Sequence, residues 1–221
     1  MRTSKPVQEH DARGRETRAL VLDTAEALFA REGITAVTLR SIAAAAGVNV
    51  AAVNYYFGSK EKLFDEMFAR RIAPLNEARV ARLAAAKAAS DGKPSLDAII
   101  EAYVLPAVEA TAPNARSIVA QYSLGRILAM PGGNRMLVRH YDRLRTAYVG
   151  ALKQALPHLA RHEVIWRYYW MGGALLCALA VPPAMIGAPF PDDGVVPAAD
   201  LVAFLVQGFR ATTTPPQRAV A

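Results

Sequence analysis

The side chains between Asn49 and Tyr56 have the types and spacing needed to contact nucleic acid. An asparagine amide can hydrogen-bond adenine, tyrosine hydroxyls reach phosphates, and Ala or Val can touch the methyl group of thymine. If the segment is one helix, Val53 and Phe57 face inward together, four residues apart. The positions left facing outward, which are candidate base and phosphate contacts, are Asn49, Val50, Ala51, Ala52, Asn54, Tyr55 and Tyr56.

Three further residues complete the predicted DNA contacts. Lys60 opens the next helix, where backbone N–H groups and an ammonium can hold a phosphate together. Thr38 and Arg40 begin the preceding helix, and the first helix of such a pair crosses the DNA backbone.

Two short helices joined by a tight turn must position these side chains. Thr38 can cap the first helix, whose predicted inner face is Leu39, Ile42, Ala43 and Ala46. Gly47 supplies the positive φ of the turn, and Asn49 can cap the second helix. This is the geometry of a helix-turn-helix, in which the second helix enters the major groove. The same pattern also fits a plain helical hairpin with solvated polar residues.

Helical spacing extends over the whole chain, so we predict an all-α protein with about nine helices. The ranges are 15–31, 38–46, 49–57, 59–89 with Pro74 inside, 95–111, 114–130, 134–156, 160–181 and 198–211. The predicted organisation is a flexible arm over 1–14, a helix-turn-helix domain over 15–60, a helical effector-binding and dimerisation domain over 61–212, and a flexible tail over 213–221.

Composition and charge restrict the classes of protein to which the chain could belong. The 221 residues carry a net charge of +7, which is compatible with nucleic acid but is not concentrated at either end. Cys177 is the only cysteine, which excludes a disulfide framework, and its apolar helix predicts packing rather than a nucleophile. The uncharged stretch 168–190 is interrupted by prolines and predicts a buried helix rather than a membrane span. No signal peptide is visible, so we expect a cytoplasmic protein.

Motifs for catalysis and metal binding are not found. The sequence has no Gly-rich phosphate loop, no nucleophile elbow and no HExxH. His140, His158 and His162 lack the spacing of metal ligands. We therefore predict no enzyme, no metal and no cofactor.

Residues 15–68 resemble the N-terminal domain of the TetR family of bacterial transcriptional regulators. The resemblance is carried by AEALFAREG (Ala25 to Gly33), IAAAAGV (Ile42 to Val48) and YYFGSKEKLF (Tyr55 to Phe64). At the turn, Asn49, Ala51, Val53 and Asn54 replace the Ser, Gly and Leu/Ile-Tyr of many members. This version resembles a branch that includes regulators responding to fatty acids or acyl-CoA, as does the stretch from His140 to Leu175.

The resemblance implies a homodimer that binds a near-palindromic operator as a ligand-responsive repressor and is released by a small apolar or acyl effector. The effector would lie among apolar residues, with Arg126 receiving a carboxylate or phosphate unless it is an ordinary ion-pair residue. The candidate wall residues are Tyr103, Tyr122, Leu124, Leu128, Met130 and Tyr141.

The last two long helices would form the dimer interface, with Trp166, Trp170, Gly173 and Phe204 at the contact. These aromatic residues could equally fill the core of one subunit. Two other functions stay open: a non-specific architectural DNA-binding protein, and a helical ligand-binding protein or enzyme without DNA binding.

Overall fold

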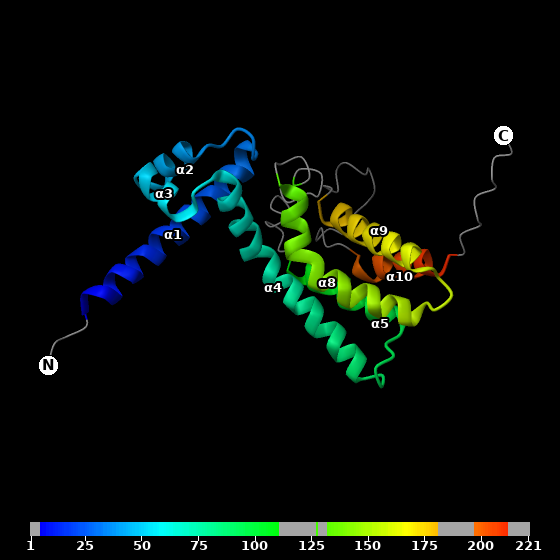
Figure 1. Cartoon of the computed structure of the whole chain (residues 1–221). Helices are drawn as coiled ribbons and strands as arrows, with labels where there is room; N and C mark the ends of the chain where they lie inside the picture. The colour runs from blue at the N-terminus through cyan, green and yellow to red at the C-terminus, as the bar shows by residue number, and fades with distance from the viewer. Residues whose placement is uncertain (1–4, 111–126, 128–131, 181–196, 212–221) are drawn as a thin grey trace, which may run out of the picture. The chain divides into compact units, whose positions relative to one another are not determined.

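The computed structural model describes residues 5–110, 127, 132–180 and 197–211, and over these ranges the chain is helical without any strand. Figure 1 shows the helices, whose labels are kept below. They are α1 (Lys5–Glu32), α2 (Leu39–Ala46), α3 (Val50–Phe57), α4 (Lys60–Ala88), α5 (Leu96–Glu109), α8 (Gly133–Ala155), α9 (Arg161–Ala180) and α10 (Ala198–Arg210). The all-α prediction is confirmed, and the helix predicted over 114–130 lies outside the described residues except for Ile127.

The chain divides into two compact units. Unit 1 contains residues 1–74 and 117–140, and unit 2 contains residues 75–116 and 141–221. Two helices, α4 and α8, belong to both units, and Pro74 inside α4 is the last residue of the first part of unit 1. A proline inside a helix removes one backbone hydrogen bond, so α4 is weakened at the place where the units divide.

Unit 1 is built around the mutual contacts of α1, α2 and α3 (Figure 1). One face of α1 is buried, with Val21 and Ala25 fully inaccessible and Phe29 nearly so. Phe29 meets Phe64 of α4 edge to face, with ring centroids 5.8 Å apart. This aromatic contact joins α1 to the start of α4.

Unit 2 packs the second half of α4 with α5, α9, α10 and the C-terminal part of α8. Its core contains Leu83, Ile99, Ile100, Tyr148, Met171 and Phe209. Arg167 on α9 is also buried, and its guanidinium donates to the carbonyls of Gly208, Phe209 and Ala211 at 2.5–3.1 Å. It therefore satisfies the free carbonyl groups at the C-terminal end of α10.

The start of the first helix differs from the prediction. The helix was expected to begin at about Arg15, whereas α1 begins at Lys5. Pro6 stands in the first turn, where its missing N–H costs nothing, and no other proline or glycine intervenes before Gly14. An anchored helix therefore extends through polar residues that show no periodicity of their own.

Candidate functional site

The first helix of the predicted pair has a complete N-terminal cap. The Oγ1 of Thr38 accepts from the backbone N–H of Ser41 at 3.1 Å, and the Oγ of Ser41 accepts from the N–H of Thr38 at 2.9 Å. This reciprocal pair is a capping box, with serine in the position that Glu or Gln usually occupies. Arg40 is exposed in the first turn of this helix, so it is free to reach a ligand from that end.

The turn between α2 and α3 requires glycine. Gly47 has φ 67° and ψ 26°, in the left-handed region, and its N–H bonds the carbonyls of Ala43 and Ala44. The N–H of Val48 then returns to the carbonyl of Ala43 at 3.0 Å. Asn49 begins α3 by accepting from the N–H of Ala51 at 2.8 Å. The predicted turn residue and both predicted caps are confirmed.

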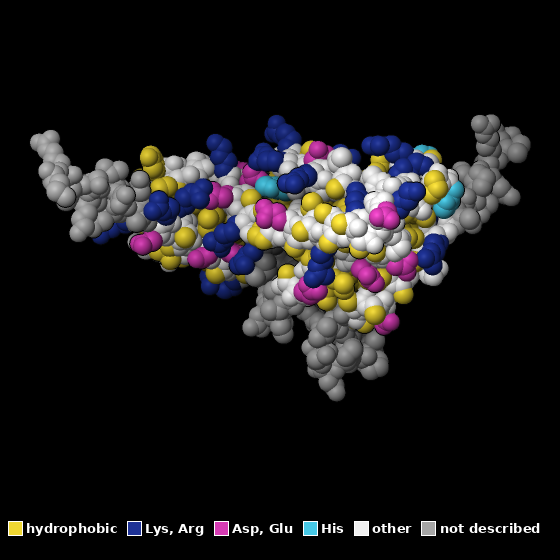
Figure 2. Space-filling view, turned by 90° about the horizontal axis from the view of Figure 1, so that it is seen from below, with side chains coloured by type: hydrophobic (Ala, Val, Ile, Leu, Met, Phe, Trp, Pro, Cys, Tyr) yellow, Lys and Arg dark blue, Asp and Glu magenta, His cyan; other side chains and the backbone are white. Residues whose placement is uncertain are grey.

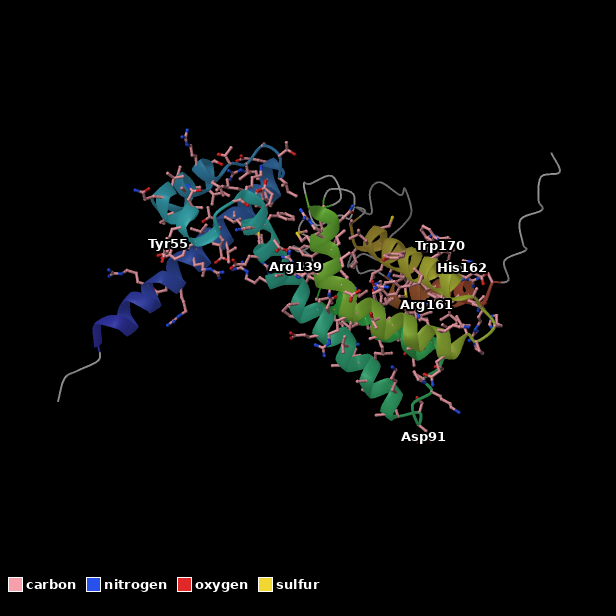
Figure 3. All side chains as sticks on the ribbon, in the orientation of Figure 1. Tyr55, Asp91, Arg139, Arg161, His162 and Trp170 are labelled. Carbon is pink, nitrogen blue, oxygen red and sulfur yellow. The ribbon has the colours of Figure 1, made fainter. Side chains whose placement is uncertain are left out.

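One face of α3 is buried and the other is open, as its spacing predicts. Val53 is inaccessible and Phe57 is 4% exposed, whereas Tyr55 is 85% exposed. Among the other predicted contacts, Asn49, Ala51 and Asn54 are exposed, and Val50, Ala52 and Tyr56 are half-buried. Figure 3 labels Tyr55 on α3. The open face thus carries a small side chain, an amide and a phenol.

Tyr56 and Lys60 also have contacts within unit 1. A Cβ on Gly14 of α1 would lie 3.4 Å from the Tyr56 hydroxyl, so the ring packs against that helix. The Nζ of Lys60 donates to the carbonyls of Thr35 and Val37 at 3.3 and 2.7 Å. Two of its three donors therefore fix the loop before α2, which sequence reasoning had not anticipated.

Ion pairs that the sequence analysis missed join the helices of unit 1. The carboxylate of Glu26 on α1 is buried and accepts from Arg71 on α4 through two N–H groups at 2.7 and 2.8 Å. Arg70 donates to the same carboxylate at 3.2 Å and to Asp23 at 2.5 Å. The available signal was that Glu26 follows Ala25 within the buried stripe of α1.

A second ion-pair cluster joins α4 to α8 within unit 1. Asp65 accepts from Arg139 and lies 2.7 Å from the Nε2 of His140. The His140 ring also packs edge to face on Phe68, with centroids 5.4 Å apart. Figure 3 labels Arg139 on α8.

Of the predicted effector residues, Tyr103 and Tyr141 are described, both in unit 2. Tyr122, Arg126 and Met130 lie outside the described residues, as do Leu124 and Leu128. Tyr103 on α5 is 5% exposed and meets Tyr148 and Tyr168 edge to face, with centroids 5.2 and 5.7 Å apart. Burial raises the pKa of Tyr141 to about 12, so its hydroxyl keeps its proton at neutral pH.

The predicted dimer residues are all exposed. Trp166, Trp170 and Phe204 are 59%, 62% and 68% exposed, which contradicts the alternative that they fill the core of the subunit. The two tryptophan rings on α9 stack with centroids 6.4 Å apart, and Figure 3 labels Trp170. Gly173 is exposed on the same helix. The four residues provide an apolar surface on α9 and α10, two helices in mutual contact.

The prediction for Cys177 was wrong. It was expected to pack inside the protein, but its side chain is exposed. Its spacing from Trp166, Trp170 and Gly173, in steps of four, three and four residues, places it on their face of α9. The helix was correctly predicted, but the direction of Cys177 was not, because all sides of the helix carry apolar residues.

Two family models match the chain. The model described as bacterial regulatory proteins, tetR family, matches residues 21–67. The model described as tetracyclin repressor-like, C-terminal domain, matches residues 101–208. The chain belongs to the tetR family. No match was found among curated proteins.

Solved structures of transcriptional regulators share the fold of this tetR-family chain. A protein of Pseudomonas aeruginosa PAO1, described as a transcriptional regulator, is 21% identical with a TM-score of 0.60, covering 87% of this chain and 92% of its own. The fatty acid degradation regulator FadR from Bacillus halodurans is 14% identical with a TM-score of 0.60, covering 89% and 97%. The ketosteroid regulator KstR2 of Mycobacterium tuberculosis is 20% identical with a TM-score of 0.55, covering 86% and 93%.

Membership of the tetR family makes the chain a transcriptional regulator with a helix-turn-helix DNA-binding domain and a helical C-terminal domain. Figure 2 shows Lys and Arg side chains spread among Asp and Glu over the visible face, so charge alone does not mark the DNA contact. None of the described helices is long and apolar enough to cross a membrane. Within the described ranges, no three His, Cys, Asp or Glu residues form a group able to hold a metal ion.

Proposed function

We propose that this regulator is a ligand-responsive repressor that binds a near-palindromic operator as a homodimer. The observation that carries the proposal is the exposed face of α3, held by the left-handed turn at Gly47. The helix is eight residues long and capped, which suits insertion into a major groove. Its open side carries Asn54 and Tyr55 instead of the apolar residues that a buried helix would have there.

The proposed division of roles on DNA follows the chemistry of each side chain. Asn54 reads adenine through its amide, Tyr55 and Tyr56 contact phosphates, and Val50, Ala51 and Ala52 contact thymine methyl groups. Thr38, Arg40, Asn49 and Lys60 reach the backbone from helix ends. Because Lys60 already uses two donors inside the protein, its expected contribution to DNA affinity is smaller than that of Arg40.

The proposed dimer is formed by the α9 and α10 face that carries Trp166, Trp170, Gly173 and Phe204. Large exposed aromatic residues grouped on adjacent helices support an interface, because soluble monomers seldom leave such groups in water. A two-fold axis through this face would bring α9 and α10 of two copies together as a four-helix bundle.

The proposed response to an effector runs through α4. This helix contains residues of both units, and Pro74 weakens it where they divide. An effector bound in unit 2 would favour an arrangement of α4 that spaces the two recognition helices wrongly for the operator. By linkage, operator DNA must weaken effector binding by the same factor.

A small apolar or acyl compound is the proposed effector, as the helical core of unit 2 is apolar and tyrosine-rich. The fold shared with the fatty acid degradation regulator FadR supports this choice of compound. Since a bacterial operator lies in the cytoplasm, we also propose a cytoplasmic location.

The test compares wild type with an Asn54→Ala, Tyr55→Ala double variant by fluorescence anisotropy on selected operator DNA. Losing one bidentate asparagine–adenine contact costs about 1–3 kcal/mol per half-site, or roughly 25-fold or more for a dimer. The matched control is Gln154→Ala, an uncharged change at an exposed position of α8 in unit 2. It should leave the affinity unchanged.

Two outcomes would contradict the proposal. If the folded double variant binds as tightly as wild type, α3 is not the recognition helix. If wild type prefers no sequence and its affinity follows salt alone, an architectural DNA-binding function replaces the repressor.

A further inference from the structure

Arg79 places a positive charge in the interior of unit 2. It lies on α4 and is only 4% exposed. Its Nε donates to the carbonyl of Tyr103 at 2.9 Å, and its Nη1 donates to the Oδ1 of Asn76 at 3.3 Å. Its guanidinium carbon lies 4.1 Å from the centroid of the Tyr103 ring, a cation–π contact.

These contacts leave the guanidinium incompletely satisfied. It has five N–H donors, and two have acceptors, so three lack one among the described residues. Within the same part of the chain no carboxylate lies in ion-pair distance of Arg79. A buried charge without a counterion is unfavourable, so among the described residues the charge and the three remaining donors of Arg79 are available to an anion.

The neighbouring side chains cannot supply the negative charge. The hydroxyl of Tyr148 donates to the backbone carbonyl of Arg79 at 2.9 Å. Burial raises the pKa of Tyr148 and of Tyr168, which keeps both phenols neutral at physiological pH. The described surroundings are therefore aromatic and uncharged. The α9 backbone also borders this site, since a Cβ on Gly172 would lie 3.3 Å from the Tyr103 hydroxyl.

We infer that Arg79 binds the carboxylate of an organic acid whose apolar body lies among the tyrosines of unit 2. This inference rests on the proposed effector response and names the chemical class of that effector. A carboxylate matches the planar guanidinium through two parallel hydrogen bonds. It also cancels the one positive charge of Arg79, whereas a doubly charged phosphate would leave a negative excess and a neutral ligand would leave the positive charge uncompensated.

The chain itself holds one competing source of negative charge. The only side-chain carboxylates of unit 2 outside the described residues are Asp192 and Asp193. Pairing of either one with Arg79 would satisfy the site without a ligand. The experiment therefore includes an Asp192→Asn, Asp193→Asn double variant.

The test is calorimetric titration of the full chain with hexanoate, decanoate and phenylacetate, each compared with its primary amide. The expected result is that wild type binds at least one carboxylate about tenfold or more tightly than its amide, the factor typical of one charge-assisted contact. Arg79→Gln should lose this preference. The matched control, Arg82→Gln, lies one turn further along α4 and removes an exposed ion pair with Glu109 at 2.5 Å. It should keep the preference.

If Arg79→Gln does not fold, Arg79→Lys replaces it in the test. Lysine keeps the positive charge but cannot make two parallel hydrogen bonds to one carboxylate, so it should weaken carboxylate binding about tenfold. The inference is overturned if wild type prefers none of the carboxylates to its amide, or if folded Arg79→Gln keeps the preference. It is also overturned if the double aspartate variant destabilises wild type but not Arg79→Gln, which would identify the counterion.

A separate measurement of operator binding distinguishes failure of the inference about Arg79 from failure of the proposed repressor function. A wild type that binds operator without preferring carboxylates refutes only the assignment of Arg79. A wild type that binds no operator refutes the repressor, whatever the carboxylates do.

Discussion

Removing the charge of Glu26 tests whether the buried ion pair holds α1 on α4. The Glu26 side chain is 8% exposed, whereas those of Arg70 and Arg71 are 35% and 48% exposed. Breaking a fully buried pair costs about 3–5 kcal/mol, and an exposed pair is worth at most about 1 kcal/mol. Because water can solvate both arginines after the change, we expect Glu26→Gln to lower the free energy of unfolding by about 2 kcal/mol.

The assay is urea unfolding followed by circular dichroism, with Glu16→Gln as the control. Glu16 is exposed on the same helix, so its replacement should change the free energy by less than about 0.5 kcal/mol. Arg71→Gln and the Glu26→Gln, Arg71→Gln double variant complete a double-mutant cycle, which should give a coupling energy between the two side chains of about 1–2 kcal/mol. If Glu26→Gln and Glu16→Gln are equally stable, the buried pair does not hold these helices together.

Three further predictions follow from the structure. Gly47→Ala should destabilise by about 1 kcal/mol in urea unfolding because of its positive φ, whereas Gly150→Ala in α8 should stabilise by about 0.5 kcal/mol; equal effects would contradict the role of the turn. Trp170→Glu should give monomers in analytical ultracentrifugation and faster alkylation of Cys177. The control Val138→Glu, at an equally exposed position, should change neither. An intact dimer of Trp170→Glu would show that the exposed face of α9 is not the dimer interface. Burial raises the pKa of Tyr141 to about 12 and also raises those of Tyr148 and Tyr168, so the folded state keeps phenolic protons that the unfolded state loses above about pH 10. The contribution of Tyr141 to stability should fall by up to about 1.4 kcal/mol per pH unit between pH 10 and 12, and the other two tyrosines should add to this fall. Unfolding curves that coincide at pH 8 and 11 would refute this.

The helix-turn-helix was predictable because its signals are local. Thr38 and Asn49 cap helices within three residues of themselves, and Gly47 fixes the turn by its own backbone conformation. The inward positions Val53 and Phe57 follow from helical spacing alone. Side chains that act on their immediate neighbours can be interpreted without knowledge of the fold.

The ion pairs and the buried arginine were not predictable for the opposite reason. Glu26 bonds a residue 45 positions away, and Arg79 bonds a carbonyl 24 positions away on another helix. Charged residues usually lie in water, so nothing in the sequence marks these two as buried. The extension of α1 was missed because its first residues have no apolar face, and helix continuation needs none.

The measurement that tests the central claim most directly is selection from a random duplex pool by the purified protein at near-physiological salt with excess competitor DNA. The account predicts enrichment of a two-fold-symmetric motif with half-sites about one helical turn apart or slightly more. Enrichment of no motif by a folded, dimeric protein would contradict it.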